Sequence, residues 1–301
     1  MLTKYLNPRN DVVFRKLFGT EDNKDLLIRF LNTILELTDN QLIEEVDFIN
    51  PWQAPRLDGA KQSIVDVLVK DKRGIRYIVE MQVSHTPEFT KRAQYYTAKT
   101  YVDQMRSGHG YRGLNSVYFI AITDYTMFPQ KSAYKSLHLV CDQATGENDL
   151  KDFRFTFIEL PKFTKQADEL SSFEDQWLFF MKHAEDLTDI PSHVDDDSVK
   201  KAFHTIERFG WEPDELLAYE DSQLAIYDEQ GRLDDSYSKG IAAGIEKGIA
   251  EGEQRGMEKG KEEGEKAKAI AIAKTMLADK FPVETIEKYT GLTQEEILKI
   301  T

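Results

Sequence analysis

The chain has 301 residues, of which 41% are hydrophobic and 11% aromatic, as in globular proteins with one large core or two smaller ones. Its formal net charge is −14, which by itself argues against an enzyme that acts on nucleic acid. The single cysteine, Cys141, excludes an internal disulfide and favours a reducing compartment.

The acidity is concentrated in one segment of the chain. Residues 1–170 contain 23 basic and 23 acidic side chains, residues 171–236 contain 5 and 18, and residues 237–301 contain 11 and 12. A neutral front segment can carry a local basic surface, so the net charge does not exclude a phosphate-bearing substrate. We therefore expect three parts: a front domain over 1–170, an acidic helical region over 171–236, and a C-terminal segment over 237–301.

The sequence shows no targeting or membrane segment, no nucleotide-binding loop and no histidine metal motif. It has no signal-peptide core at its start and no apolar stretch long enough to span a membrane. It has no Gly-x-x-x-x-Gly-Lys phosphate loop, and its 6 histidines show no metal-ligand spacing. We expect a cytoplasmic protein with no membrane association and no nucleotide cofactor.

The front segment opens with two amphipathic helices, over residues 11–18 and 25–37. Asn10 or Asp11 can cap the first helix, and Gly19 can end it. Residues 63–83 follow as two alternating apolar runs joined by a charged turn, which predicts a hairpin.

The hairpin carries polar side chains on one face. Folding about its turn places Asp66 opposite Glu80, within about one residue, and Gln82 lies two residues further along the same face. A carboxylate in an apolar strand must be paired or must bind a metal. One interpretation is a structural Asp66 bonded to an arginine such as Arg76. The other is a site for Mg²⁺, which prefers hard oxygen ligands, and the shared face of Asp66, Glu80 and Gln82 favours it.

A helix is predicted after the hairpin. Thr86 as N-cap and Pro87 at the first position predict its start, and it should run to about Arg106. The predicted inward stripe is Tyr95, Ala98, Val102 and Met105. The predicted polar stripe is Arg92, Tyr96, Lys99, Asp103 and Arg106. Three strands over 116–123, 136–141 and 153–160 then complete an α/β sheet of mixed direction.

Helices are predicted for the acidic region, over 173–187, 200–209 and 213–227. Its acidic side chains either form a solvated helical surface or restrain a basic DNA site by competing with DNA. After it, glycine recurs at every fourth residue, at Gly240, Gly244, Gly248, Gly252, Gly256, Gly260 and Gly264. Each glycine weakens a helix by about 1 kcal/mol relative to alanine, so we expect a helix whose glycine stripe packs closely against a partner. A flexible charged linker is the alternative.

The last residues predict a small helix-turn-helix. A helix over 267–280 precedes two short ones, and Thr293 with Glu296 forms a capping box. The final helix is short and acidic, so we expect a role in packing or oligomerisation rather than in a major groove.

Several of these stretches together resemble a known family. Asp66 followed by Glu80-Met81-Gln82 on adjacent strands resembles the PD-(D/E)XK nuclease core. The stretches 10–19, 77–82, 92–96 and 159–163, with the glycine repeat, are similar to the Rpn family of recombination-promoting nucleases, also described as transposases. The resemblance covers nearly the full chain.

This resemblance implies a restriction-endonuclease-like mixed sheet and an Mg²⁺-dependent DNA endonuclease linked to recombination or to mobile DNA; other divalent cations could serve. On this resemblance, Asp66 and Glu80 would be metal ligands together with the backbone carbonyl of Met81. Asp11 would either join them or cap its helix. Gln82 replaces the usual lysine and would orient water or phosphate. The missing charge would come from Lys91, Arg92 or Lys99, and these three residues with Arg106 would contact DNA phosphates. The alternative is a weak or inactive DNA-binding or oligomeric regulatory protein, and a homo-oligomer is expected through the glycine helix.

Overall fold

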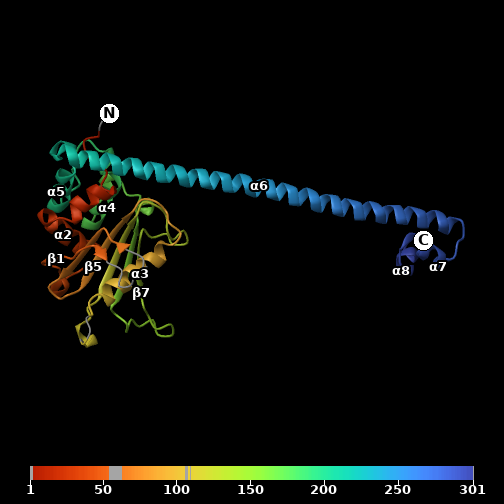
Figure 1. The fold of residues 1–301 in the computed structure, drawn as a ribbon, viewed down its shortest axis with the longest axis horizontal. Coiled ribbons are helices and arrows are strands. Elements are labelled where there is room, and N and C mark those ends of the chain that lie inside the picture. Colours follow the sequence, from red (N-terminus) through yellow and green to blue (C-terminus); the bar gives the residue numbers. More distant parts are fainter. Residues whose placement is uncertain (1–2, 54–62, 106–107, 109, 301) are drawn as a thin grey trace. The chain divides into compact units, whose positions relative to one another are not determined.

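A six-stranded mixed sheet forms the centre of the first part of the protein (Figure 1). The computed structural model describes residues 3–53, 63–105, 108 and 110–300. The strands of this sheet are β1 (Val46–Phe48), β4 (Val67–Asp71), β5 (Arg76–Gln82), β6 (Val117–Thr123), β7 (Lys135–Leu139) and β8 (Phe153–Glu159). Their order is β1-β4-β5-β6-β8-β7; β5, β6 and β8 are parallel and the other pairs antiparallel. The predicted mixed α/β sheet is confirmed.

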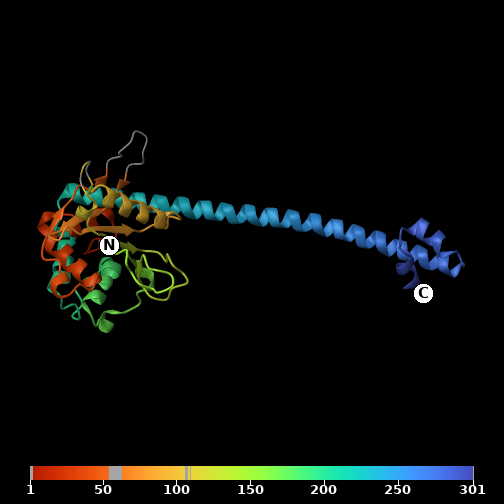
Figure 2. The same cartoon turned by 90° about the horizontal axis from the view of Figure 1, so that it is seen from below.

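Helices cover both faces of this sheet (Figure 2). They are α1 (Asp11–Phe18), α2 (Lys24–Ile34), α3 (Phe89–Val102), α4 (Phe173–His183) and α5 (Asp197–Thr205). The larger core contains Phe14, Phe30 and Trp177, so α1, α2 and α4 pack on one face with α5. Phe89 and Ala93 of α3 pack on the other face, where Ile78 and Phe119 project from β5 and β6. Alternation along the strands therefore determines which side chains of β5 face α3.

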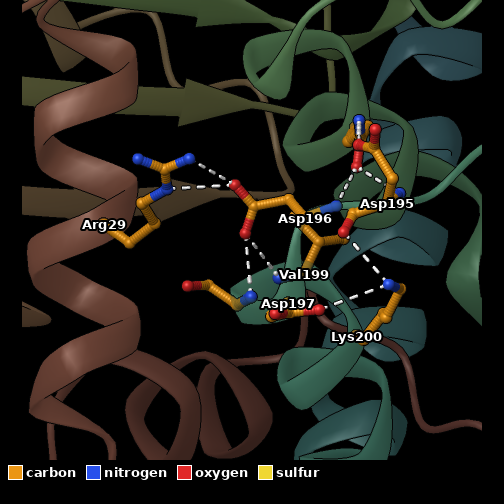
Figure 3. Close-up of polar contacts among 8 residues, drawn as sticks. Arg29, Asp195, Asp196, Asp197, Val199 and Lys200 are labelled. Atoms are coloured by element: carbon orange, nitrogen blue, oxygen red, sulfur yellow. Dashed lines mark hydrogen bonds and ion pairs between the residues drawn. The ribbon is translucent and has the colours of Figure 1, made fainter.

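The acidic region contributes to the same core. Trp177 and Phe203, from α4 and α5, are fully buried in the larger core. Figure 3 shows one polar attachment, in which Arg29 of α2 reaches the carboxylate of Asp196 at the start of α5. Residues 190–236 therefore contribute Phe203 to the core of the first unit.

Helix α3 differs from its predicted bounds and from its predicted inward stripe. Its N-cap is Glu88, and Thr86 makes no capping hydrogen bond through its side chain. The buried residues are Phe89, Ala93, Thr97 and Thr100, whereas Tyr95 and Val102 are 46% and 48% exposed. Apolar character alone misplaced the buried face, because two threonines and an alanine lie on it beside Phe89.

The C-terminal part forms a second compact unit over residues 231–301, after a first unit over residues 1–230. Helix α6 (Pro213–Ala278) belongs to both, so the helix predicted over 213–227 is continuous with the glycine helix and with its predicted continuation over 267–280. Then α7 (Val283–Thr290) and α8 (Gln294–Leu298) follow Ala278 as the predicted helix-turn-helix. Ile286, Leu292 and Ile297 form a small core with Ala273, and Thr293 and Glu296 make the predicted capping box. No helix in the described ranges is long and apolar enough to cross a membrane.

Candidate active site

The hairpin of β4 and β5 places Asp66 beside Glu80. Val67 pairs with Val79 and Leu68 with Ile78, and one further step along this register brings Asp66 opposite Glu80. The predicted register is confirmed. One local difference from the prediction is that the first strand is interrupted: β3 (Ser63–Ile64) pairs with β2 (Trp52–Gln53), and Asp66 lies in the gap before β4.

This interruption leaves the backbone of Asp66 available to the opposite carboxylate. The Asp66 amide donates a hydrogen bond to Glu80 Oε1 at 3.3 Å. In return, the amide of Met81 donates to Asp66 Oδ2 at 3.0 Å. These two contacts hold the carboxylates of Asp66 and Glu80 close together at the same end of the hairpin.

Both carboxylates titrate above their usual range. Burial raises the pKa of Glu80 well above 4.5, and the charge of Asp66 raises it further; Glu80 is 3% exposed. Burial is also the largest cause of the raised pKa of Asp66. Arg15 of α1 opposes this, since its Nη2 lies 3.3 Å from Asp66 Oδ1. The arginine proposed as the structural partner, Arg76, instead donates to the Thr100 carbonyl at 3.0 Å.

Gln82 connects this pair to α3. Its Nε2 donates to Glu80 Oε2 at 3.2 Å and to the Met81 carbonyl at 2.9 Å. Its Oε1 accepts a hydrogen bond from the Arg92 guanidinium. Of the three cations expected to supply the charge that Gln82 lacks, Arg92 is therefore the one that contacts Gln82.

The remaining predicted residues are two lysines of α3, Arg106 and Asp11. Lys91 is exposed beside Arg92, and Lys99 lies two turns further along α3. Arg106 lies outside the described residues. Asp11 does not cap α1, because the Asn10 side chain accepts the Val12 amide at 2.9 Å.

Asp11 nevertheless contributes to the electrostatics of the site. It is near enough to Asp66 to raise the pKa of that carboxyl, and its own pKa is raised by partial burial and by Glu229, against the effect of Arg15. In the described parts of the chain, no three acidic, histidine or cysteine side chains lie close enough together to hold one metal ion. Asp11 therefore does not form such a three-residue group with Asp66 and Glu80.

The donor set of this pair fits a divalent cation. Two neighbouring carboxylates that repel each other are stabilised by a shared cation, and hard oxygen ligands suit Mg²⁺ and Mn²⁺. The Met81 carbonyl, which accepts a hydrogen bond from Gln82, is an additional oxygen donor beside the pair. When bound, such a cation would lower the pKa of a water molecule and polarise a phosphate.

Two site residues were missed or given another role from the sequence. Arg15 was not predicted as a site residue, although a carboxylate such as Asp66 in an apolar hairpin calls for a cationic partner. Tyr96 was placed on a polar stripe, yet Glu80 and Asp66 are among the causes of its raised pKa, after burial. Periodicity could not identify either residue, because the elements that carry them meet Asp66 and Glu80 only in the folded chain.

The mixed six-stranded sheet with flanking helices is consistent with an α/β fold of the PD-(D/E)XK class, and Asp66 and Glu80 lie at one end of its β4–β5 hairpin. A family model described as PD-(D/E)XK nuclease family transposase matches residues 8–236. A second, described as Rpn/YhgA-like nuclease family, C-terminal HTH domain, matches residues 266–301. The chain thus belongs to the Rpn family of PD-(D/E)XK nucleases and transposases. Searches of curated proteins and of solved structures gave no match.

Proposed function

We propose that this protein is a divalent-metal-dependent DNA endonuclease that promotes recombination or acts on mobile DNA. The contact between Asp66 and Glu80 is the observation that carries the proposal. Two carboxylates with raised pKa values, Glu80 buried and Asp66 partly buried, lie side by side and form a site that a cation would complete. Family membership supports nuclease chemistry at this position.

Each residue of the site has a proposed part. Asp66 and Glu80 hold Mg²⁺, with the Met81 carbonyl as a third donor. Gln82 orients the attacking water or the phosphate through its amide group. Arg92, which hydrogen-bonds Gln82, supplies positive charge near the phosphate as it becomes more negative during cleavage. Lys91 and Lys99 on α3, with Arg106, contact neighbouring phosphates of the DNA.

Plasmid cleavage in Mg²⁺ tests this assignment. Asp66→Ala and Glu80→Gln should each lower the cleavage rate by about 100-fold or more, because each removes a charge that acts in the transition state. Asp47→Ala, which removes a carboxylate from a side chain that is 65% exposed, is the matched control and should cleave like the wild type. Equal cleavage by all four proteins would show that Asp66 and Glu80 do not form the cleavage site.

A second candidate function rests on Gln82. An amide brings no positive charge of its own, so the same fold could serve as a weak or inactive DNA-binding regulator. If folded wild-type protein binds DNA but cleaves none in Mg²⁺ or Mn²⁺, this second function replaces the first.

We further infer that α6 associates with a second copy of the chain through its glycine stripe. At all seven glycines, a built Cβ atom meets no other described atom within 4 Å beyond the local helix backbone. The isoleucines that follow three of them, Ile241, Ile245 and Ile249, are 46%, 58% and 57% exposed. A helix weakened by about 1 kcal/mol per glycine gains most from close contact along this bare stripe.

Light scattering tests this association. Gly248→Leu with Gly252→Leu should lower the mass of the assembly, because added side chains separate the two helices. These substitutions also favour the helix, so lost helix content would not explain the result. Lys247→Leu with Glu251→Leu adds the same side chain beside the stripe and should leave the mass unchanged. A monomeric wild type would contradict the inference.

A further inference from the structure

A pocket of about 610 Å³ lies next to the proposed cleavage site. It is formed by the loop after β5 and the first turns of α3, and its lining residues are Thr86, Pro87, Glu88, Lys91, Arg92, Tyr95 and Tyr96. Its volume falls within the range of about 300–1,000 Å³ that is typical of small-molecule sites. Arg92 belongs to both places, since it lines the pocket and hydrogen-bonds Gln82.

Two polar atoms of the lining residues lack a partner. Thr86 Oγ1 and Arg92 Nε are buried, and neither forms a hydrogen bond with any described residue. Leaving a buried polar atom unpaired costs about 1–3 kcal/mol, so a ligand that pairs with it gains affinity. Arg92 Nε can only donate, whereas the Thr86 hydroxyl can donate or accept. A ligand rich in acceptor oxygens, such as a phosphodiester, suits both atoms.

The same pocket offers an aromatic surface. Tyr95 is 46% exposed, and its ring centroid lies 6.3 Å from that of Tyr96. Lys91 lies one turn before Tyr95 on α3, so a cation and an aromatic ring are neighbours on the helix surface. Exposed aromatic rings beside basic side chains are the means by which proteins bind unpaired nucleotides, because every base can stack on a ring. Glu88 is the one carboxylate of the lining, and it could accept a hydrogen bond from a base amine.

We propose that this pocket holds one unpaired nucleotide of the DNA, immediately beside the phosphate that is cleaved. Its base stacks on Tyr95, and its phosphate faces Lys91 and Arg92. The inference rests on the proposed function, because it takes Asp66 and Glu80 as the cleavage site. In a continuous duplex the bases are paired and stacked, and moving one into a pocket costs a few kcal/mol. The preferred substrate is therefore DNA with a single-stranded segment, such as a gap, a flap or a loop.

Binding is measured in EDTA, so that it does not depend on cleavage. The probe is a single-stranded oligonucleotide that carries 2-aminopurine, whose fluorescence is quenched when the base stacks on a ring. Wild-type protein should quench it and bind it more tightly than a duplex of the same length. Tyr95→Ala should lose the quenching and weaken single-strand binding by about 10-fold, as expected for one lost stacking contact.

Two matched variants complete the test. Tyr95→Phe keeps the ring and should behave like the wild type, which separates stacking from the loss of a hydroxyl. Tyr111→Ala removes an 83% exposed tyrosine that does not line the pocket and should also behave like the wild type. Thermal unfolding of each variant checks that it is folded.

Different results overturn the inference and the proposed function. If Tyr95→Ala keeps both the quenching and the affinity, or if duplex binds as tightly as single strand, the pocket is not a nucleotide site. Plasmid cleavage by the wild type would still support the nuclease in that case. If Tyr95→Ala loses binding as expected while Asp66→Ala and Glu80→Gln cleave like the wild type, the pocket stands and the assigned cleavage site fails.

Discussion

The guanidinium of Arg92 donates a hydrogen bond to the side-chain oxygen of Gln82, and Gln82 in turn donates to Glu80. A cation on α3 thus contacts Gln82, the residue that would stand in place of a strand lysine in the proposed site. We expect Arg92→Ala to lower cleavage, because Gln82 alone brings no charge to the phosphate. Gln82→Lys alone should also lower the cleavage rate, since the lysine would lie against Arg92 and like charges repel.

The double variant makes this prediction specific. Arg92→Ala with Gln82→Lys moves the single charge from the helix to the strand and should cleave faster than either single variant. Rates of plasmid cleavage in a double-mutant cycle measure the coupling, which we expect to exceed about 1 kcal/mol. Strictly additive effects would mean that Arg92 and Gln82 act independently, and the contact between them would then have no part in cleavage.

The stability of the metal-free protein should depend on pH through Glu80. Burial and Asp66 raise the pKa of Glu80 in the folded state well above 4.5, the ordinary value that applies in the unfolded chain. Above pH 4.5 the folded state keeps a proton that the unfolded state has lost, so stability falls as the pH rises until Glu80 ionises in the folded state too. Glu80→Gln cannot ionise and should show a flatter profile of melting temperature against pH in EDTA.

Added Mg²⁺ should reverse this fall in stability with rising pH. A cation binds the ionised carboxylates, so its stabilising effect on the wild type should increase with pH as protons are released. Glu80→Gln and Asp66→Ala should gain little from Mg²⁺ at any pH, whereas Asp47→Ala should gain as much as the wild type. Equal gains by all of these proteins would place the bound ion elsewhere.

The two hairpin carboxylates could be paired from sequence because both depend on local rules. Alternation with period two and a short turn determine that Asp66 faces Glu80, and the strand register agrees. The helix caps of α1 and α8 likewise follow from residues within three positions of each other. Local spacing therefore predicts what one element, or two consecutive elements, can form.

Contacts between distant elements could not be predicted in this way. The contact of Arg15 with Asp66 joins α1 to the hairpin, and nothing in either stretch specifies the partner. The buried face of α3 was misjudged for a related reason, because Thr97 and Thr100 are buried on it although neither is hydrophobic. The helix expected over 213–227 does not end there but runs into the glycine helix as one continuous α6, since no residue after it breaks the helix before Ala278.

The turn that sets the hairpin register depends on Gly74. Its φ is +83°, a conformation that is unfavourable for other residues by about 1–2 kcal/mol, and a Cβ atom there would lie 2.8 Å from Asn115 Nδ2. Gly74→Ala should therefore destabilise the protein by more than the backbone strain alone. Gly146→Ala is a matched control, because Gly146 has φ +76° and open space around it. Denaturant unfolding of both variants measures the difference, and equal losses would show that Asn115 moves aside freely.

The attachment of α5 to the rest of the first unit gives a last prediction, on stability alone. Asp196 Oδ1 caps α5 by accepting the Ser198 amide at 2.8 Å, and its Oδ2 accepts two hydrogen bonds from Arg29, at 3.0 and 2.8 Å. The side chain of Asp196 is 3% exposed, so these bonds are poorly replaced by water when it is removed. We expect Asp196→Ala to lower the free energy of unfolding by about 2–3 kcal/mol, and Asp196→Asn, which keeps the cap, by less.

The neighbouring residue provides the control for this change. The side chain of Asp197 is 98% exposed and forms an ion pair with Lys200 at 3.3 Å, so Asp197→Ala should change stability by less than about 0.5 kcal/mol. Both variants remove one negative charge from the acidic region, and urea unfolding compares them directly. If the two lose equal stability, charge in this region matters more than the buried contacts of Asp196. The expected difference would instead show that an acidic residue of this region is structural, because it joins α5 to α2 beneath the surface.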